Sequence, residues 1–236
     1  MDLLSFQQPE INVPCKIICN KEEKNTKEEE STLENENIQL KQYIYEPNSF
    51  SLTNIQMLQV IGILEQFKPN NICEFGTGIT TKVFELYCKK YKKNLLNIEH
   101  SIKYQRESSK MFKLNKKKDI IINNIKYSQT NIYEGLEEFF KSYDKKFDFV
   151  LIDAPTGETN KYKYGRIQMI DLIVFNLLDN EGYFLIHNTE KYCIQISVNV
   201  LLSLFKKKNY NTVIENLGYN NNKRLTIIHF KKKINK

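Results

Sequence analysis

The sequence predicts an α/β fold, a doubly wound and mostly parallel sheet of seven strands with an antiparallel last strand and helices on both faces. Short apolar runs alternate with segments of helical periodicity between residues 51 and 206. Their spacing suits right-handed crossovers, which bury a parallel sheet on both faces. The last two apolar runs, near 209–215 and 224–230, have no helical segment between them. They must pair by a tighter return, which places an antiparallel strand in the sheet.

The remaining elements follow in a regular order. The first helix is expected over 51–67, where apolar residues recur at helical spacing after a capping Ser51 or Thr53. The other strands are expected where short apolar runs occur, at 71–75, 94–100, 119–129, 147–153 and 182–188. The other helices are expected at 79–92, after a capping Ser101, and at 133–142, 165–178 and 190–206.

Composition indicates one globular domain preceded by a polar extension. The chain has 236 residues, of which 41% are hydrophobic and 27% charged, as in soluble proteins. Residues 1–41 carry nine acidic residues against five lysines, and we expect them to be disordered before a domain of residues 42–236. The sequence shows neither a signal peptide nor a membrane-length apolar run, so a cytoplasmic location without membrane insertion is expected. The five scattered cysteines agree with this.

The net charge of +7 leaves a nucleic-acid partner open without favouring it. A basic domain attracts nucleic acid and other anions. However, the chain is rich in Lys and Asn throughout, which suits compositional drift.

A glycine turn follows the first strand, in the sequence ICEFGTGITT. Gly76 and Gly78 stand where the chain must turn sharply into a helix, and glycine lets the backbone approach a ligand there. Glu99 ends the next strand, 23 residues after Gly76. A carboxylate at that point can accept hydrogen bonds from both ribose hydroxyls of a nucleoside. The two features together predict a nucleoside-binding site at the carboxyl edge of the sheet.

This pattern is similar to class I S-adenosylmethionine-dependent methyltransferases, and the resemblance covers roughly residues 50–230. It implies S-adenosylmethionine as the cofactor, with the glycine turn at its methionine part and Glu99 at its ribose. Asn131 would read the adenine, and Asp153 would lie beside the reactive centre. The cofactor-binding residues that the resemblance implies are Glu74, Gly76, Thr77, Gly78, Thr80, Glu99, His100, Asn131 and Asp153.

One departure bears on the choice between enzyme classes. Thr80 occupies the third glycine position of the turn. The EFGxGxT form recurs among the methyltransferases that this chain resembles. It is unusual in dinucleotide-binding oxidoreductases, where a glycine lets the helix pack against the strand beneath the pyrophosphate. Together with the antiparallel end of the sheet, it favours a methyltransferase over an NAD-dependent oxidoreductase.

The residues after the fourth strand bear on the acceptor. Methyltransferases of exocyclic nitrogens usually carry (D/N)PP(Y/F/W) here, whereas this chain has Asp153-Ala154-Pro155-Thr156. Oxygen or carbon acceptors are therefore favoured. The IDAP sequence, Arg166 and the HNTEK segment also resemble a bacterial group associated with surface-polysaccharide genes. That resemblance implies a small-molecule or glycan acceptor.

Three side chains are the candidates for catalysis. His187 ends the fifth strand, and a neutral imidazole suits the removal of a hydroxyl proton. Asp153 is the alternative base, or it orients the cofactor. Arg166 is either a surface residue or a group that grips a phosphate or carboxylate of the acceptor.

Several alternatives stay open from the sequence. Metal-dependent catechol-type O-methyltransferases would use Asp153, His187 and Asn188 as ligands, but imidazole disfavours Mg²⁺, so no metal is expected. An RNA or protein methyltransferase and a non-catalytic S-adenosylmethionine-binding module are the rival functions. The sequence identifies neither the acceptor nor the oligomeric state.

Overall fold

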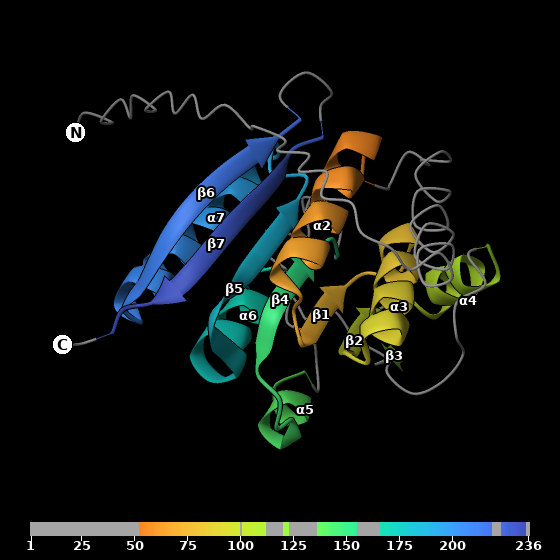
Figure 1. Cartoon of the computed structure of the whole chain (residues 1–236), viewed down its shortest axis with the longest axis horizontal. Helices are drawn as coiled ribbons and strands as arrows, with labels where there is room; N and C mark the ends of the chain where they lie inside the picture. Colours follow the sequence, from red (N-terminus) through yellow and green to blue (C-terminus); the bar gives the residue numbers. More distant parts are fainter. Residues whose placement is uncertain are drawn as a thin grey trace, which may run out of the picture. The chain divides into compact units, whose positions relative to one another are not determined.

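The computed structural model describes residues 52–99, 101–111, 120–122, 136–154, 166–218 and 223–234. Within this part of the chain, seven strands form one sheet in the order β3-β2-β1-β4-β5-β7-β6 (Figure 1). The strands are β1 (Asn71–Phe75), β2 (Asn94–Glu99), β3 (Ile120–Ile122), β4 (Phe147–Ile152), β5 (Leu178–His187), β6 (Tyr210–Leu217) and β7 (Leu225–Lys232). The helices are α2 (Asn54–Phe67), α3 (Ile79–Tyr91), α4 (Ile102–Met111), α5 (Leu136–Ser142), α6 (Ile167–Leu172), the π-helical η2 (Ile173–Leu177) and α7 (Tyr192–Lys207).

The sheet is parallel except where β7 enters it. β1 pairs in parallel with β2 and β4, and the sheet continues in parallel to β3 on one side and β5 on the other. β7 lies between β5 and β6 and is antiparallel to both. The expected α/β architecture, mostly parallel with an antiparallel last strand, is confirmed.

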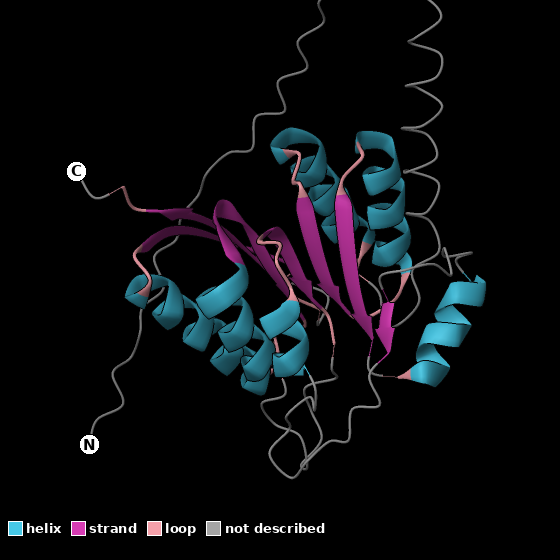
Figure 2. Ribbon diagram, turned by 90° about the horizontal axis from the view of Figure 1, so that it is seen from below, coloured by secondary structure: helices cyan, strands magenta, loops and turns pink. Residues whose placement is uncertain are grey.

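Helices pack on both faces of the sheet (Figure 2). Successive side chains of a strand point to opposite faces. Leu151 and Leu185 accordingly belong to the apolar cluster with α2 and α3, whereas Ile152 and Ile186 belong to the cluster with α5, α6 and α7. We call these the α2 side and the α7 side. None of the described helices is long and apolar enough to cross a membrane.

The first described helix begins where a local signal predicts it. The Thr53 side chain accepts a hydrogen bond from the backbone N–H of Gln56, whose own side chain accepts from the Thr53 N–H. This reciprocal capping box satisfies two of the N–H groups that a helix start leaves without partners. Of the two expected caps, Thr53 is therefore the residue in use, and Ser51 lies outside the described residues.

The largest difference from expectation lies between β4 and β5. A single helix over 165–178 was expected, but α6 gives way to the π-helical η2, and β5 begins at Leu178 instead of residue 182. The polar sequence LDNEG resembles a turn. It is extended here because Leu178 pairs with Phe147 and Glu181 pairs with Lys231 across the sheet. Pairing with neighbouring strands overrides the local preference.

Two glycines with opposite surroundings test this packing. A Cβ added at Gly182 would lie 2.0 Å from the carbonyl oxygen of Asp148 and 2.8 Å from Cζ of Phe230, whereas a Cβ at Gly62 meets no described atom within 4 Å. Gly182→Ala should therefore force β4 and β5 apart and destabilise the protein by about 1–3 kcal/mol or more. Gly62→Ala, inside α2, should stabilise it by about 0.5–1 kcal/mol. Urea unfolding of both variants measures the difference, and equal effects would contradict the packing of β5 described above.

Candidate functional site

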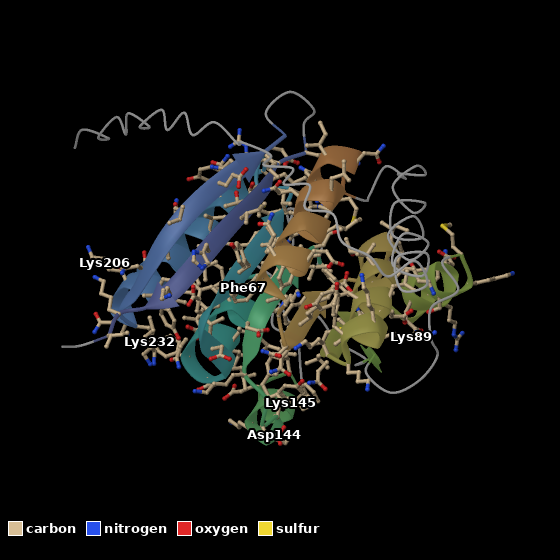
Figure 3. The ribbon with its side chains drawn as sticks, in the orientation of Figure 1. Phe67, Lys89, Asp144, Lys145, Lys206 and Lys232 are labelled. Carbon is tan, nitrogen blue, oxygen red and sulfur yellow. The ribbon has the colours of Figure 1, made fainter. Side chains whose placement is uncertain are left out.

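Most of the polar residues expected at the site project from one face of the sheet at one edge. β1, β2, β4 and β5 are parallel neighbours, so their carboxyl ends meet at the same edge. Glu74, Asp153 and His187 each lie two positions after an apolar residue of the α2-side cluster, and therefore point to the α2 side. Asp144, which precedes β4, lies at the opposite edge (Figure 3).

The turn after β1 requires glycine at its first position. Gly76 has φ +107°, in the region that side chains rarely adopt, and a Cβ there would lie 3.3 Å from Cβ of Ala154 and 3.6 Å from Cβ of Asp153. Gly76 N donates to Ile98 O, while Asp153 N and Ala154 N both donate to Phe75 O. The turn is thus fixed directly against the residue that follows β4.

Gly78 differs from Gly76. Its backbone is extended, with φ −171°, and an added Cβ would meet no described atom within 4 Å. Its N–H donates to the hydroxyl of Thr81 at 2.9 Å, at the start of α3. The space beside Gly78 is therefore open among the described residues.

Asn97, in the middle of β2, joins the turn to the acid that precedes it. Its Nδ2 donates to Oε2 of Glu74 at 2.7 Å and to the carbonyl oxygen of Gly76 at 2.7 Å. Its Oδ1 accepts from the hydroxyl of Thr77 at 2.7 Å. The side chains of Glu74, Thr77 and Asn97 are at most 3% exposed. The side-chain amide thus determines the position of the turn relative to β1.

Sequence analysis missed Asn97. The available signal is its position two residues before Glu99, between the apolar residues Leu96 and Ile98. Alternation along the strand places the side chains of Asn97 and Glu99 on the same face. The sequence therefore indicates a polar residue beside the predicted ribose-binding acid.

Glu74 is a buried carboxyl with neutral hydrogen-bonding partners. Its Oε1 accepts from the hydroxyl of Thr80, and its Oε2 accepts from Asn97. Burial raises the pKa of Glu74 from 4.5 to about 8, and the charge of Asp153 adds to the increase against the opposing hydrogen bonds. Glu74 is therefore mainly neutral at pH 7.

Glu99 holds the next loop in place. Its Oε2 accepts from the backbone N–H of Thr77 at 2.9 Å, and its Oε1 accepts from the N–H of Ser101 at 2.8 Å. Ser101 itself caps α4, as expected, because its hydroxyl accepts from the N–H of Tyr104. A carboxylate oxygen can accept more than one hydrogen bond, so these bonds are compatible with ribose binding, which stays a prediction.

Asp153 and His187 form a buried pair. Oδ1 of Asp153 lies 2.7 Å from Nδ1 of His187, and the imidazole is 0% exposed. Burial alone would raise the pKa of Asp153, but the electrostatic interaction and hydrogen bond with His187 and the charge of the Arg166 guanidinium outweigh burial and lower that pKa. Asp153 is therefore ionised and accepts the Nδ1 proton. Nε2 of His187 is buried without a hydrogen-bond partner among the described residues.

Arg166 binds the backbone carbonyls of both members of this pair. It is 1% exposed and precedes α6. Its Nη1 donates to the carbonyl oxygens of Ile152 at 3.2 Å and His187 at 2.6 Å, and its Nη2 donates to that of Asp153 at 2.9 Å. Arg166 is thus not a surface residue. Its expected contact with the acceptor stays a prediction, but both terminal nitrogens already bind backbone carbonyls.

Two expected cofactor contacts, His100 and Asn131, lie outside the described residues. The structure brings the other predicted site residues together at the edge formed by β1, β2, β4 and β5. Thr77 and Thr80 both take part there through their hydroxyls.

The neutral state of Glu74 predicts how stability depends on pH. The unfolded chain loses this proton near pH 4.5, whereas the folded chain keeps it until about pH 8. Glu74 therefore lowers stability as pH rises between these values, by up to about 1.4 kcal/mol per pH unit. Glu74→Gln replaces the carboxyl with an amide that does not ionise, so it should remove this loss. Urea unfolding at about pH 5 and about pH 8 measures the difference.

The matched control for that experiment is Glu137→Gln. Glu137 is exposed on α5 and pairs with Lys141 at 2.9 Å, so its substitution should leave the pH dependence nearly unchanged. Parallel pH profiles for the wild type and Glu74→Gln would show that Glu74 is ionised in the folded protein.

Comparison with known proteins supports the fold. No protein-family model matches the sequence, and no curated protein matches it. Among solved structures, the chain is similar to the SAH-bound methyltransferase PaMTH1 of Podospora anserina, with 14% identity, a TM-score of 0.55 and coverage of 91% of this chain and 100% of that one. It is also similar to the O-methyltransferase of Bacillus cereus in complex with SAH, with 15% identity, a TM-score of 0.55 and coverage of 92% and 94%. The chain therefore has the Rossmann-like α/β fold that these methyltransferases share.

Proposed function

We propose that this chain is an S-adenosylmethionine-dependent methyltransferase that methylates an oxygen atom of a small-molecule or glycan acceptor. The observation that carries the proposal is the position of the Asp153–His187 pair. The pair lies directly beside the glycine turn, where Cβ of Asp153 is 3.6 Å from the place of a Cβ on Gly76. A potential base and a potential cofactor turn thus meet at one edge of the sheet.

The residues at this edge fit the cofactor. The space beside Gly78 is open, and Glu99 is held by two backbone N–H groups at the end of β2. Solved structures with this fold hold SAH, the demethylated form of the cofactor. We assign the methionine part to the turn, the ribose to Glu99 and the adenine to Asn131, with His100 beside the adenosine.

The Asp153–His187 pair is arranged to remove a proton. Because Asp153 accepts the Nδ1 proton, the Nε2 atom of neutral His187 carries the lone pair. A hydroxyl of the acceptor could therefore donate to Nε2, which has no other partner among the described residues. Asp153 would stabilise the imidazolium that forms when His187 takes the proton, as in other Asp–His pairs.

Bound S-adenosylmethionine would supply an electrophilic methyl group, whose bonding electron pair stays with sulfur when the acceptor oxygen bonds to the carbon. The protein has to bring that oxygen into line and to accept its proton. His187 at the end of β5 and the turn after β1 lie on either side of Asp153, so this edge can supply both requirements. The acceptor class rests on the absence of a (D/N)PP motif after β4 and on the O-methyltransferase similarity.

The first functional prediction concerns cofactor binding. Gly78→Val should leave the ligand-free fold intact, because the added side chain begins in open space, but should abolish binding by occupying the cofactor's place. Glu99→Ala should weaken binding by roughly tenfold or more, since a hydrogen bond to a charged group contributes about 1.5–3 kcal/mol. Isothermal titration calorimetry with S-adenosylmethionine, SAH and NAD measures both effects. Normal S-adenosylmethionine binding in both variants, or a preference for NAD, would contradict the assignment.

The second functional prediction concerns His187 as the base that accepts the proton of the acceptor. His187→Gln should lower turnover by about 10²–10⁴, the usual share of general-base catalysis, and should leave the S-adenosylmethionine affinity nearly unchanged. Methyl transfer to a panel of hydroxyl-bearing acceptors, detected by mass spectrometry, measures turnover. Because Asp153 already occupies Nδ1 of His187, we expect EDTA to have no effect.

A different result would identify the rival mechanism. Activity that disappears with EDTA and returns with a divalent ion would make Asp153, His187 and Asn188 metal ligands. Cofactor binding without transfer to any acceptor would favour the non-catalytic module, and transfer only to RNA or protein would change the acceptor class.

A further inference from the structure

Arg166 connects two strand ends that are distant in sequence. Among the described residues, it binds three carbonyls that lie 13, 14 and 21 residues away, at the ends of β4 and β5. They include the carbonyls of both members of the Asp153–His187 pair. The guanidinium thus binds the backbone of the residues whose side chains form the proposed base.

Burial of this side chain needs a physical explanation. Arg166 is among the largest fully buried side chains of the described residues. A buried guanidinium is costly unless its donors and its charge find partners. The three carbonyls accept from its donors, and the carboxylate of Asp153 is close enough for its pKa to be lowered by the arginine charge.

The same contacts limit what Arg166 can do for an acceptor. Gripping a phosphate or carboxylate uses the terminal nitrogens of the planar fork. Here Nη1 is bound to Ile152 and His187, and Nη2 to Asp153. Turning the fork toward a ligand would leave three carbonyls at the strand ends without this donor, and an unsatisfied buried polar group is destabilising.

We propose that Arg166 is a positioning residue, which fixes the two strand ends so that the Asp153 carboxylate accepts the hydrogen bond from Nδ1–H of His187 and Nε2 of His187 faces the acceptor. This proposal rests on the proposed function, but its central quantity, the tautomer of His187, exists without cofactor or acceptor. The 2.6 Å bond to the His187 carbonyl fixes the backbone from which the imidazole extends. The bond to the Asp153 carbonyl does the same for its partner.

The experiment compares Arg166→Lys and Arg166→Met with the wild type. Lysine keeps the charge but presents its donors from one nitrogen instead of from a planar fork, and methionine removes both the charge and the donors. Lys206→Met is the matched control, since Lys206 is an exposed cation near the C-terminal end of α7 (Figure 3). The ¹⁵N ring shifts of His187 in cofactor-free protein report its tautomer. The chain has three histidines, and His187→Gln assigns the signal.

In the wild type and in Lys206→Met, we expect a single neutral tautomer with the proton on Nδ1. Both Arg166 variants should show a mixture of tautomers. Their turnover should fall by ~10²-fold, the cost of misplacing a catalytic group by about 1 Å, with the KM for S-adenosylmethionine little changed. Circular dichroism and the melting temperature check that the variants are folded.

Three outcomes would overturn the proposal. The first is a wild-type tautomer and wild-type turnover in folded Arg166→Met. The second is an unchanged tautomer with a raised KM for an acceptor, which would restore the acceptor-binding role of Arg166. The third is loss of the native fold in both Arg166 variants, which would make the arginine a requirement of folding. Absence of methyl transfer in the wild type would instead reject the proposed function and leave the tautomer test of Arg166 standing.

Discussion

Parallel strands that end at one edge of a sheet bury polar groups that must find partners within the protein. The carbonyl oxygens of Ile152, Asp153 and His187 lie at the ends of β4 and β5, and the turn after β1 carries further N–H and C=O groups. Asn97, Glu99 and Arg166 fill these needs, through the turn carbonyl, the turn N–H and the strand-end carbonyls respectively. Since an unsatisfied buried group costs about 1–3 kcal/mol, these side chains hold the shape of the edge.

The same constraint explains why the site is on the α2 side. Strand alternation sends every second side chain to that face, so Glu74, Asn97 and Glu99 lie together once β1 and β2 pair in parallel. The turn must then pass over this group, and Gly76 permits it because its left-handed backbone has no side chain to collide with Ala154. The alternation of side chains along the paired strands β1 and β2 therefore determines both the polar residues at this edge and the path of the turn that passes over them.

Two buried carboxyl groups at this edge take opposite charge states. Glu74 has only neutral donors around it, and its pKa rises to about 8. Asp153 has His187 and Arg166 as neighbours, and its pKa falls. The ionised Asp153 in turn helps keep Glu74 neutral, because two like charges in one low-dielectric region repel each other. Of these two groups, only Asp153 is therefore negatively charged near neutral pH, and it contacts the proposed base.

The sequence by itself determined the features that depend on local signals or on strand order. Thr53 and Ser101 cap their helices through contacts within three residues, and Gly76 marks the turn because few other residues adopt its φ of +107°. The carboxyl ends of β1, β2, β4 and β5 meet because parallel strands separated by helices must end together, and this placed Glu99, Asp153 and His187 at one edge. Only the tertiary structure decided the contacts made across the chain. The Asp153–His187 bond spans 34 residues, and the carbonyls held by Arg166 belong to two strands. β5 begins at Leu178 because neighbouring strands pair with a segment whose own composition favours a turn. Such partners are set by packing over distances that local propensity does not encode.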